Sequence, residues 1–80
     1  MTNGKLITLA QMQAGQSGIV VGFRGGFGLI DRLNALGIVP GKTLTKISAM
    51  IARGPVTIEV DRVQLAIGFG MANRIMLEVE

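Results

Sequence analysis

Four residue types that supply much of protein chemistry are missing from this 80-residue chain: cysteine, histidine, tyrosine and tryptophan. Without cysteine the chain has no disulfides, which suits a reducing cytoplasm. Without histidine or cysteine it has no imidazole base, no thiolate nucleophile and no soft metal ligand. These absences exclude zinc hydrolysis, triad catalysis and iron–sulfur ligation, so we expect neither enzyme activity nor a bound cofactor.

Long apolar runs are also missing, although 49% of the residues are hydrophobic and only 16% are charged. No stretch approaches the roughly 18–20 apolar residues that a membrane span needs. The N-terminal sequence MTNGKLITLAQM lacks the basic segment and apolar core of a signal peptide. We therefore expect a soluble, cytoplasmic protein with no membrane insertion. Its length predicts one domain over residues 1–80, with a small core that leaves weak self-association open.

Charge is sparse and spread along the chain. Eight Lys/Arg against five Asp/Glu give a net charge of +3, without a run of like charge. Surfaces that bind nucleic acid cluster their basic residues and place aromatic side chains among them for stacking. Here only Phe23 beside Arg24 has that character. The pattern disfavours nucleic-acid binding, and a nucleic-acid-binding barrel stays open as the alternative function.

One stretch, Leu29–Gly41, has the pattern of a short amphipathic helix followed by a stop. Its apolar residues recur at helical spacing, at Leu29, Ile30, Leu33 and Leu36. Asp31 is expected in the first turn, where a negative charge complements the helix dipole. No other segment has so clear a helical pattern, so we expect this helix to close the core of a β-structure.

The end of this helix is predicted from its turn residues. Gly37 follows the last apolar position and suits the left-handed conformation that ends many helices. Ile38 is then placed to fold back onto Leu33, and Pro40 with Gly41 prevents continuation and turns the chain.

The rest of the chain has the pattern of short strands. Five segments are β-branched or alternate between apolar and polar residues: 19–23, 43–51, 56–60, 63–67 and 75–79. A lead-in segment with apolar residues, 6–12, precedes them. We expect a mainly β fold, a small SH3-like, partly open barrel of about five strands with one short α-helix packed on it.

The connections carry further predictions. In the segment 43–51, Leu44 and Ile47 are three positions apart, so in a regular strand they would face opposite sides of the sheet. A bulge around Thr45–Lys46 is therefore predicted. Asp61–Arg62 is short enough for a hairpin turn. The glycine-rich connection 68–73 has room for one helical turn.

Two kinds of small-ligand site are weighed and disfavoured. Four glycines, Gly22, Gly25, Gly26 and Gly28, precede the helix, an arrangement that can hold an anion. No Lys followed by Ser/Thr completes a phosphate-binding loop, so a hinge with positive φ values is favoured.

The pairs Glu59/Asp61 and Glu78/Glu80 each share a strand face and could hold a hard cation weakly. Ferrous sites usually recruit histidine as well, so we expect solvated strand edges and no metal site.

A partner-binding surface is the favoured functional feature. Large apolar side chains lie at strand ends or in glycine-rich segments, and a small barrel cannot bury all of them. With the arginines beside them, the candidate contact residues are Phe23, Arg24, Phe27, Arg32, Met50, Phe69 and Met71.

The chain also resembles a known family along nearly its whole length. The matching residues are Leu9, Met12, Gly15, Gly18-Ile19, Gly25-Gly26, Arg32–Gly41, Gly54-Pro55, Leu65–Ile67 and Ala72–Ile75. The segment Arg32–Gly41, RLNALGIVPG, matches the hallmark R-L-x-x-L-G-I/L-x-P-G of the FeoA family. Departures are Asp61–Arg62, where the family often has a glycine, and Gly68–Met71, where charged residues are common.

This resemblance implies a small cytoplasmic SH3-like protein of bacterial ferrous iron transport and iron homeostasis. Its implied partner is the membrane transporter FeoB, which carries a cytoplasmic GTPase domain. The same fold also forms the C-terminal domain of iron-dependent repressors of the DtxR type. A stand-alone regulatory domain is therefore a further alternative, which the absence of a helix-turn-helix segment disfavours.

Overall fold

The computed structural model describes residues 4–48 and 54–80. In chain order its elements are β1 (Lys5–Thr8), the 3-10 helix η1 (Leu9–Gln11), β2 (Ser17–Phe23), α1 (Phe27–Ala35), β3 (Thr43–Lys46), β4 (Val56–Val60), β5 (Val63–Ile67), α2 (Phe69–Ala72) and β6 (Ile75–Val79). None of the helices in these two ranges is long and apolar enough to cross a membrane.

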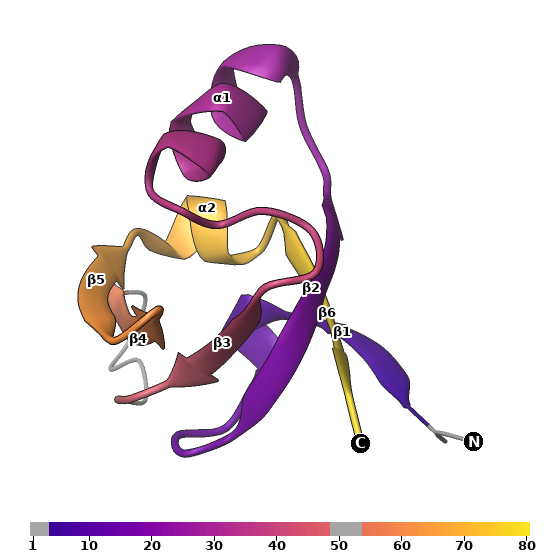
Figure 1. Ribbon diagram of the computed structural model, residues 1–80, viewed down its shortest axis with the longest axis vertical. Helices are drawn as coiled ribbons and strands as arrows, with labels where there is room; N and C mark the ends of the chain where they lie inside the picture. Colours follow the sequence, from indigo (N-terminus) through magenta and orange to yellow (C-terminus); the bar gives the residue numbers. More distant parts are fainter. Residues whose placement is uncertain (1–3, 49–53) are drawn as a thin grey trace.

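Within the described residues the strands form one antiparallel sheet in the order β1-β6-β2-β3-β4-β5. The sheet curls so that β4 and β5 lie on one side and β1 and β6 on the other, with α2 between them (Figure 1). The helix α1 lies beyond one end of the curled sheet. The mainly β, SH3-like prediction is confirmed, with six strands in place of about five because part of the expected lead-in segment pairs with β6 as β1.

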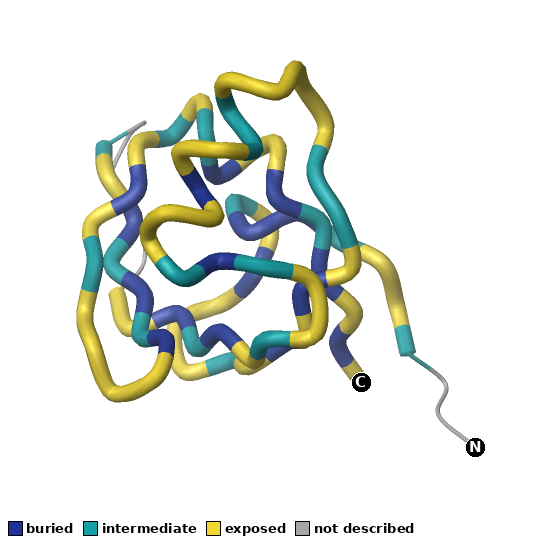
Figure 2. Tube along the Cα trace, turned by 45° about the horizontal axis from the view of Figure 1, so that its top comes forward, coloured by how far each residue is buried: buried dark blue, intermediate teal, exposed yellow. Residues whose placement is uncertain are grey.

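The core follows the period-2 pattern of the sequence. In β4 and β6 every apolar position of the inner face is buried, and Figure 2 shows buried and exposed positions alternating along the chain. The buried apolar side chains of the described residues are Leu9, Met12, Val20, Leu33, Ile38, Leu44, Val56, Ile58, Val60, Ile67, Ala72, Ile75, Leu77 and Val79. Residues of η1, α1 and α2 therefore complete a core that the strands alone would leave open.

The predicted bulge lies just after Thr45–Lys46. The pairs Thr45↔Glu59 and Lys46↔Ile58 are in register, but the N–H groups of Ile47 and Ser48 both donate to the Thr57 carbonyl, at 2.8 and 3.5 Å, so two residues oppose one. A second irregularity, a register shift, lies in β2 between Val20 and Gly22, where the strand pairs with β6. Within β3 the side chains alternate regularly between the two faces, since Lys46 is the next buried residue after Leu44 and Ile47 is exposed. Residues 49–51 of the predicted long strand lie outside the described residues.

The β4–β5 hairpin is confirmed, with Asp61 and Arg62 as its two turn residues. Both have positive φ, 51° and 67°, as the type I′ turn requires. Asp61 also accepts a 2.7 Å hydrogen bond from the Lys42 ammonium, which ties the turn to the start of β3. The backbone strain at Arg62 is accordingly the cost of a turn built without glycine.

Replacing Arg62 by glycine should relieve this strain and raise the free energy of unfolding by about 0.5–1 kcal/mol. Arg62→Ala is the matched control, because it removes the same side chain but keeps the unfavourable φ. Urea denaturation of both variants checks the prediction, and equal midpoints for Gly and Ala would contradict it.

The helix α1 begins earlier than expected but ends where predicted. It starts at Phe27, so Asp31 lies beyond the first turn, which contains no acidic residue. At the other end Gly37 has φ 89° and donates to the Asn34 carbonyl at 3.0 Å. The Ile38 N–H donates to the Leu33 carbonyl at 3.0 Å, which completes a Schellman motif. Leu33 and Ile38 are both fully buried, so the helix stop also fixes two core side chains.

Gly37→Val should lower the free energy of unfolding by about 1–2 kcal/mol, because a β-branched residue resists positive φ. A Cβ at this position would meet nothing within 4 Å, so the loss comes from the backbone and not from a clash. Gly37→Asn is the control, since asparagine tolerates the left-handed region. Thermal melting should rank the variants Gly, Asn, Val. A valine variant as stable as the asparagine variant would refute this explanation.

Candidate docking surface

The segment between β2 and α1 places a large aromatic side chain in solvent. Phe27, the first residue of α1, is 86% exposed, the highest value among the large apolar side chains described. Just before it, Gly25 has φ 144° and turns the chain from the strand into the helix. A Cβ on Gly25 would lie 2.6 Å from Leu29 Cδ2, so glycine also allows the helix to fold back closely. The turn thus positions Phe27 outward while Leu29 is half-buried.

Two arginines flank this turn from different elements. The Arg24 N–H donates to the Arg74 carbonyl at 2.8 Å, which joins the end of β2 to the residue before β6. The Arg74 guanidinium lies close to the turn, since its Nη1 is 3.5 Å from where a Gly25 Cβ would be. Both arginines are exposed. Arg24, Phe27 and Arg74 together are called the Phe27 surface below.

The structure separates the other predicted contact residues from this surface. Phe23 and Met71 are half-buried and pack against the core, and Phe69 is half-buried. Arg32 is exposed in the last turn of α1, around the helix from Phe27. Met50 lies outside the described residues.

Arg74 is a member of the Phe27 surface that sequence reasoning missed. It is 50 positions away from Arg24, and only the pairing of β2 with β6 brings the two together. No local pattern around Arg74 gave this signal.

The glycine-rich segment gives one hinge residue and not several. Of the four glycines that precede or begin α1, only Gly25 has positive φ. Gly26 is the N-cap of the helix and supplies no side-chain hydrogen bond. The hinge therefore lies where it was predicted, but only one of its glycines, Gly25, adopts a positive φ.

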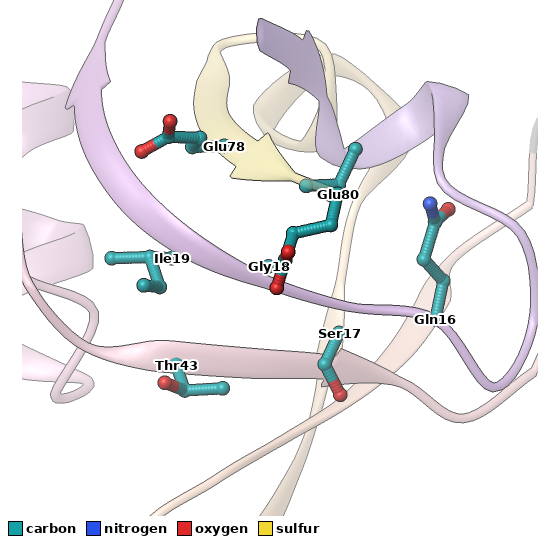
Figure 3. Close-up of a pocket in the computed structure, with 8 residues that line it drawn as sticks. Gln16, Ser17, Gly18, Ile19, Thr43, Glu78 and Glu80 are labelled. Carbon is teal, nitrogen blue, oxygen red and sulfur yellow. The ribbon is translucent and has the colours of Figure 1, made fainter. Parts of the chain in front are cut away.

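A pocket of about 370 Å³ lies on the outer face of the sheet (Figure 3). It is lined by Gln16, Ser17, Gly18, Ile19, Thr43, Glu78, Val79 and Glu80. A Cβ on Gly18 would lie 2.8 Å from Val79 Cγ1, so glycine allows β6 to approach β2 closely here. As expected from their spacing, Glu78 and Glu80 share this face. No group of three metal-binding side chains occurs among residues 4–48 and 54–80.

The other carboxylate pair, Glu59 and Asp61, is engaged within the fold. Asp61 pairs with Lys42, as described above, and Glu59 lies opposite Thr45 in the β3–β4 register. The pair is therefore divided between β4 and the turn. Because β4 and β6 each lie between two other strands of the described sheet, neither carboxylate pair lies at a sheet edge as expected.

A buried lysine joins β3 to η1. Lys46 is only 3% exposed, and its ammonium donates to the carbonyls of Leu9, Ala10 and Met12 at 3.4, 3.3 and 2.5 Å. These carbonyls belong to η1 and the residue after it, so the ammonium satisfies acceptors at the end of that helix. Burial lowers the pKa of Lys46. Its place in the core makes it a structural residue. The only sign of this in the sequence is the irregular spacing of Leu44 and Ile47, the two apolar residues on either side of it.

Comparison with known proteins assigns the family. The FeoA domain family matches residues 7–79. A crystal structure of an iron uptake regulatory protein, FeoA, is 34% identical, covers 94% of this chain and 100% of its own, and superposes with a TM-score of 0.87. Among curated proteins no sequence matches significantly.

More distant structures agree on the fold. FeoA from Stenotrophomonas maltophilia, solved with zinc and described as a prokaryotic SH3 domain protein, is 20% identical with a TM-score of 0.76, covering 89% of this chain and 88% of its own. A manganese-dependent transcriptional repressor is 15% identical with a TM-score of 0.87 and covers all of this chain, which spans 45% of the repressor. At such identities the likeness concerns the fold alone. The match over residues 7–79 and the 34% identity to a solved FeoA structure show that this chain belongs to the FeoA family.

Proposed function

We propose that this FeoA protein is a non-enzymatic, cytoplasmic accessory factor of bacterial ferrous iron transport. It binds the cytoplasmic, GTPase-bearing part of FeoB through the Phe27 surface. By binding one state of the transporter better than another, it shifts the balance between those states and modulates iron uptake. The observation that carries the proposal is the 86% exposure of Phe27, at the end of a turn that Arg24 and Arg74 flank.

The chemistry of the Phe27 surface suits a protein partner. Burying a phenylalanine side chain contributes about 1.5–3 kcal/mol, which an 86% exposed ring has not yet gained in the free protein. Aromatic residues and arginine are also the residues most often found at the energetic centre of interfaces. Arg24 and Arg74 can each pair with an acidic side chain of the partner, so this surface favours a partner site with an apolar centre and an acidic rim.

Binding, and not turnover, is the role that the residues support. The glycines before α1 are not followed by the Lys and Ser/Thr that hold nucleotide phosphates and magnesium. We therefore assign nucleotide hydrolysis to the partner and none to this chain.

Retention on the immobilised cytoplasmic part of FeoB tests the proposal, with single-stranded RNA immobilised in parallel. We expect the protein to be retained by FeoB at about 0.15 M salt and not by RNA. Strongly salt-sensitive retention by RNA, with none by FeoB, would replace the proposed function by nucleic-acid binding.

A further inference from the structure

The strand β5 is the terminal strand of the sheet, and one of its edges is unpaired within the described residues. It pairs with β4 alone, from Val63↔Val60 to Ile67↔Val56, and lies at the margin of the molecule in Figure 1. Val63 is 54% exposed, and Gln64 and Ala66 are exposed as well. Within the described residues no strand therefore covers this edge, and three of the five residues along it are exposed.

The hairpin geometry shows which backbone groups point to this edge. A two-residue turn closes on a pair that exchanges both of its hydrogen bonds, here Val60 and Val63. Because bonded and non-bonded pairs alternate, Leu65 and Ile67 also direct their N–H and C=O toward β4. Gln64 and Ala66 then direct theirs away from it. The edge thus offers two donors and two acceptors.

β5 also lacks the features that usually protect an edge strand. Natural edges carry lysine or proline, are very short, or are covered. The sequence of β5, VQLAI, has neither a charge nor a proline. The opposite edge differs, since β1 has only four residues, begins with the exposed Lys5, and has its Thr8 N–H bonded to the Gln11 side chain at 2.9 Å. The contrast points to β5 as the edge open to pairing.

We propose that a second copy of this chain pairs with β5, antiparallel and about a twofold axis at Leu65. In this register Gln64 lies opposite Ala66 of the second copy, and the reverse, so all four free backbone groups of each copy are bonded. Leu65 faces its own equivalent, and Val63 faces Ile67 of the second copy. No charged residue within β5 meets a like charge, so the strand is complementary to itself.

This interface is separate from the Phe27 surface and does not depend on the proposed function. In a twofold dimer both Phe27 surfaces stay available, so one dimer presents two copies of the docking surface. Loss of FeoB binding and loss of β5 pairing are therefore distinguishable by experiment.

Amide hydrogen exchange of the full chain, at about 20 μM and about 1 mM, tests the pairing together with sedimentation equilibrium. We expect a monomer–dimer equilibrium in which Gln64 and Ala66 amides become protected as the dimer forms. The Leu65 amide, bonded within the hairpin, should already be protected in the monomer. A chain that stays monomeric at 1 mM, or a dimer without added protection at Gln64 and Ala66, would overturn the proposal.

The variant Gln64→Lys/Ala66→Lys supplies an independent test, because it places lysines opposite each other twice across the axis. We expect dimerisation to weaken at least about tenfold. Gln13→Lys/Ala14→Lys adds the same charge in an exposed turn and should dimerise like the parent. If dimerisation weakened equally in both variants, the cause would be the added net charge and not the pairing of β5.

Protection of Gln64 and Ala66 only when the FeoB cytoplasmic part is added to a monomeric chain would assign the edge to that partner instead. Either result overturns self-pairing.

Discussion

Lys46→Met should lower the free energy of unfolding by about 2–4 kcal/mol, the largest stability loss that we expect from a change of one polar side chain. Methionine fills much of the space of the lysine stem but cannot donate to the carbonyls of Leu9, Ala10 and Met12. A buried acceptor that loses its partner costs roughly 1–3 kcal/mol. The Leu9 carbonyl keeps the Met12 N–H as a donor, and the burial of the ammonium is relieved in the variant, so the total stays below the sum of three such losses.

Lys5→Met is the matched control, because it makes the same chemical change at an exposed position. Urea denaturation should show a large loss for Lys46→Met and nearly none for Lys5→Met. If the two variants were equally stable, the three hydrogen bonds would carry no net stabilisation.

The pH dependence of stability gives a second measure of Lys46. Burial lowers its pKa in the folded protein below the ordinary value of 10.5, so at intermediate pH the unfolded chain binds more protons than the native chain. The contribution of Lys46 to the free energy of unfolding should therefore rise as the pH increases from the folded pKa to 10.5. The chain has no tyrosine or cysteine, so few other groups titrate in this range. The rise should be absent from Lys46→Met and present in Lys5→Met.

Phe27→Ser should weaken binding to the cytoplasmic part of FeoB by at least about tenfold, the largest binding effect that we expect from one substitution. The estimate follows from the roughly 1.5–3 kcal/mol that burial of the ring contributes. Because Phe27 is 86% exposed in the free protein, its loss should leave the melting temperature nearly unchanged. A loss of binding would then report on the interface and not on folding.

Leu6→Ser is the control for this prediction. Leu6 is 61% exposed and lies on β1, away from the turn that carries Phe27. Isothermal titration of each variant with the FeoB cytoplasmic part should show weakened binding for Phe27→Ser alone. Equal affinities for the parent and Phe27→Ser would remove Phe27 from the interface.

Features set by local chemistry could be predicted from the sequence. The stop after α1 depends on Gly37 and the residues next to it, and the β4–β5 hairpin depends on two alternating runs around a two-residue turn. In both cases neighbouring residues determine the conformation. The turn and both strands of the predicted hairpin therefore agree with the structure.

Features set by distant partners could not be predicted. The inward position of Lys46 depends on three carbonyls that lie 34–37 residues earlier in the chain. Arg74 joins Arg24 only through the pairing of β2 with β6. β1 was expected as a lead-in because its pairing with the last strand leaves no local pattern.

The exposure of the candidate residues was equally inaccessible from the sequence. Phe23, Phe27 and Phe69 all lie beside glycines, yet only Phe27 is left almost entirely in solvent. The difference arises because α1 begins two residues earlier than its apolar pattern indicates, which places Phe27 at the start of the helix. Sequence reasoning found the right segment, and the structure selects the residue within it.

The most direct test is to follow amide chemical shifts of the labelled protein while the cytoplasmic part of FeoB is added. If FeoB binds the Phe27 surface, the largest amide shift changes should fall in residues 24–29 and 73–75. The residues of the pocket on the outer sheet face should change little. Changes confined to that pocket, at residues 16–19 and 78–80, or no change at saturating FeoB, would contradict this assignment.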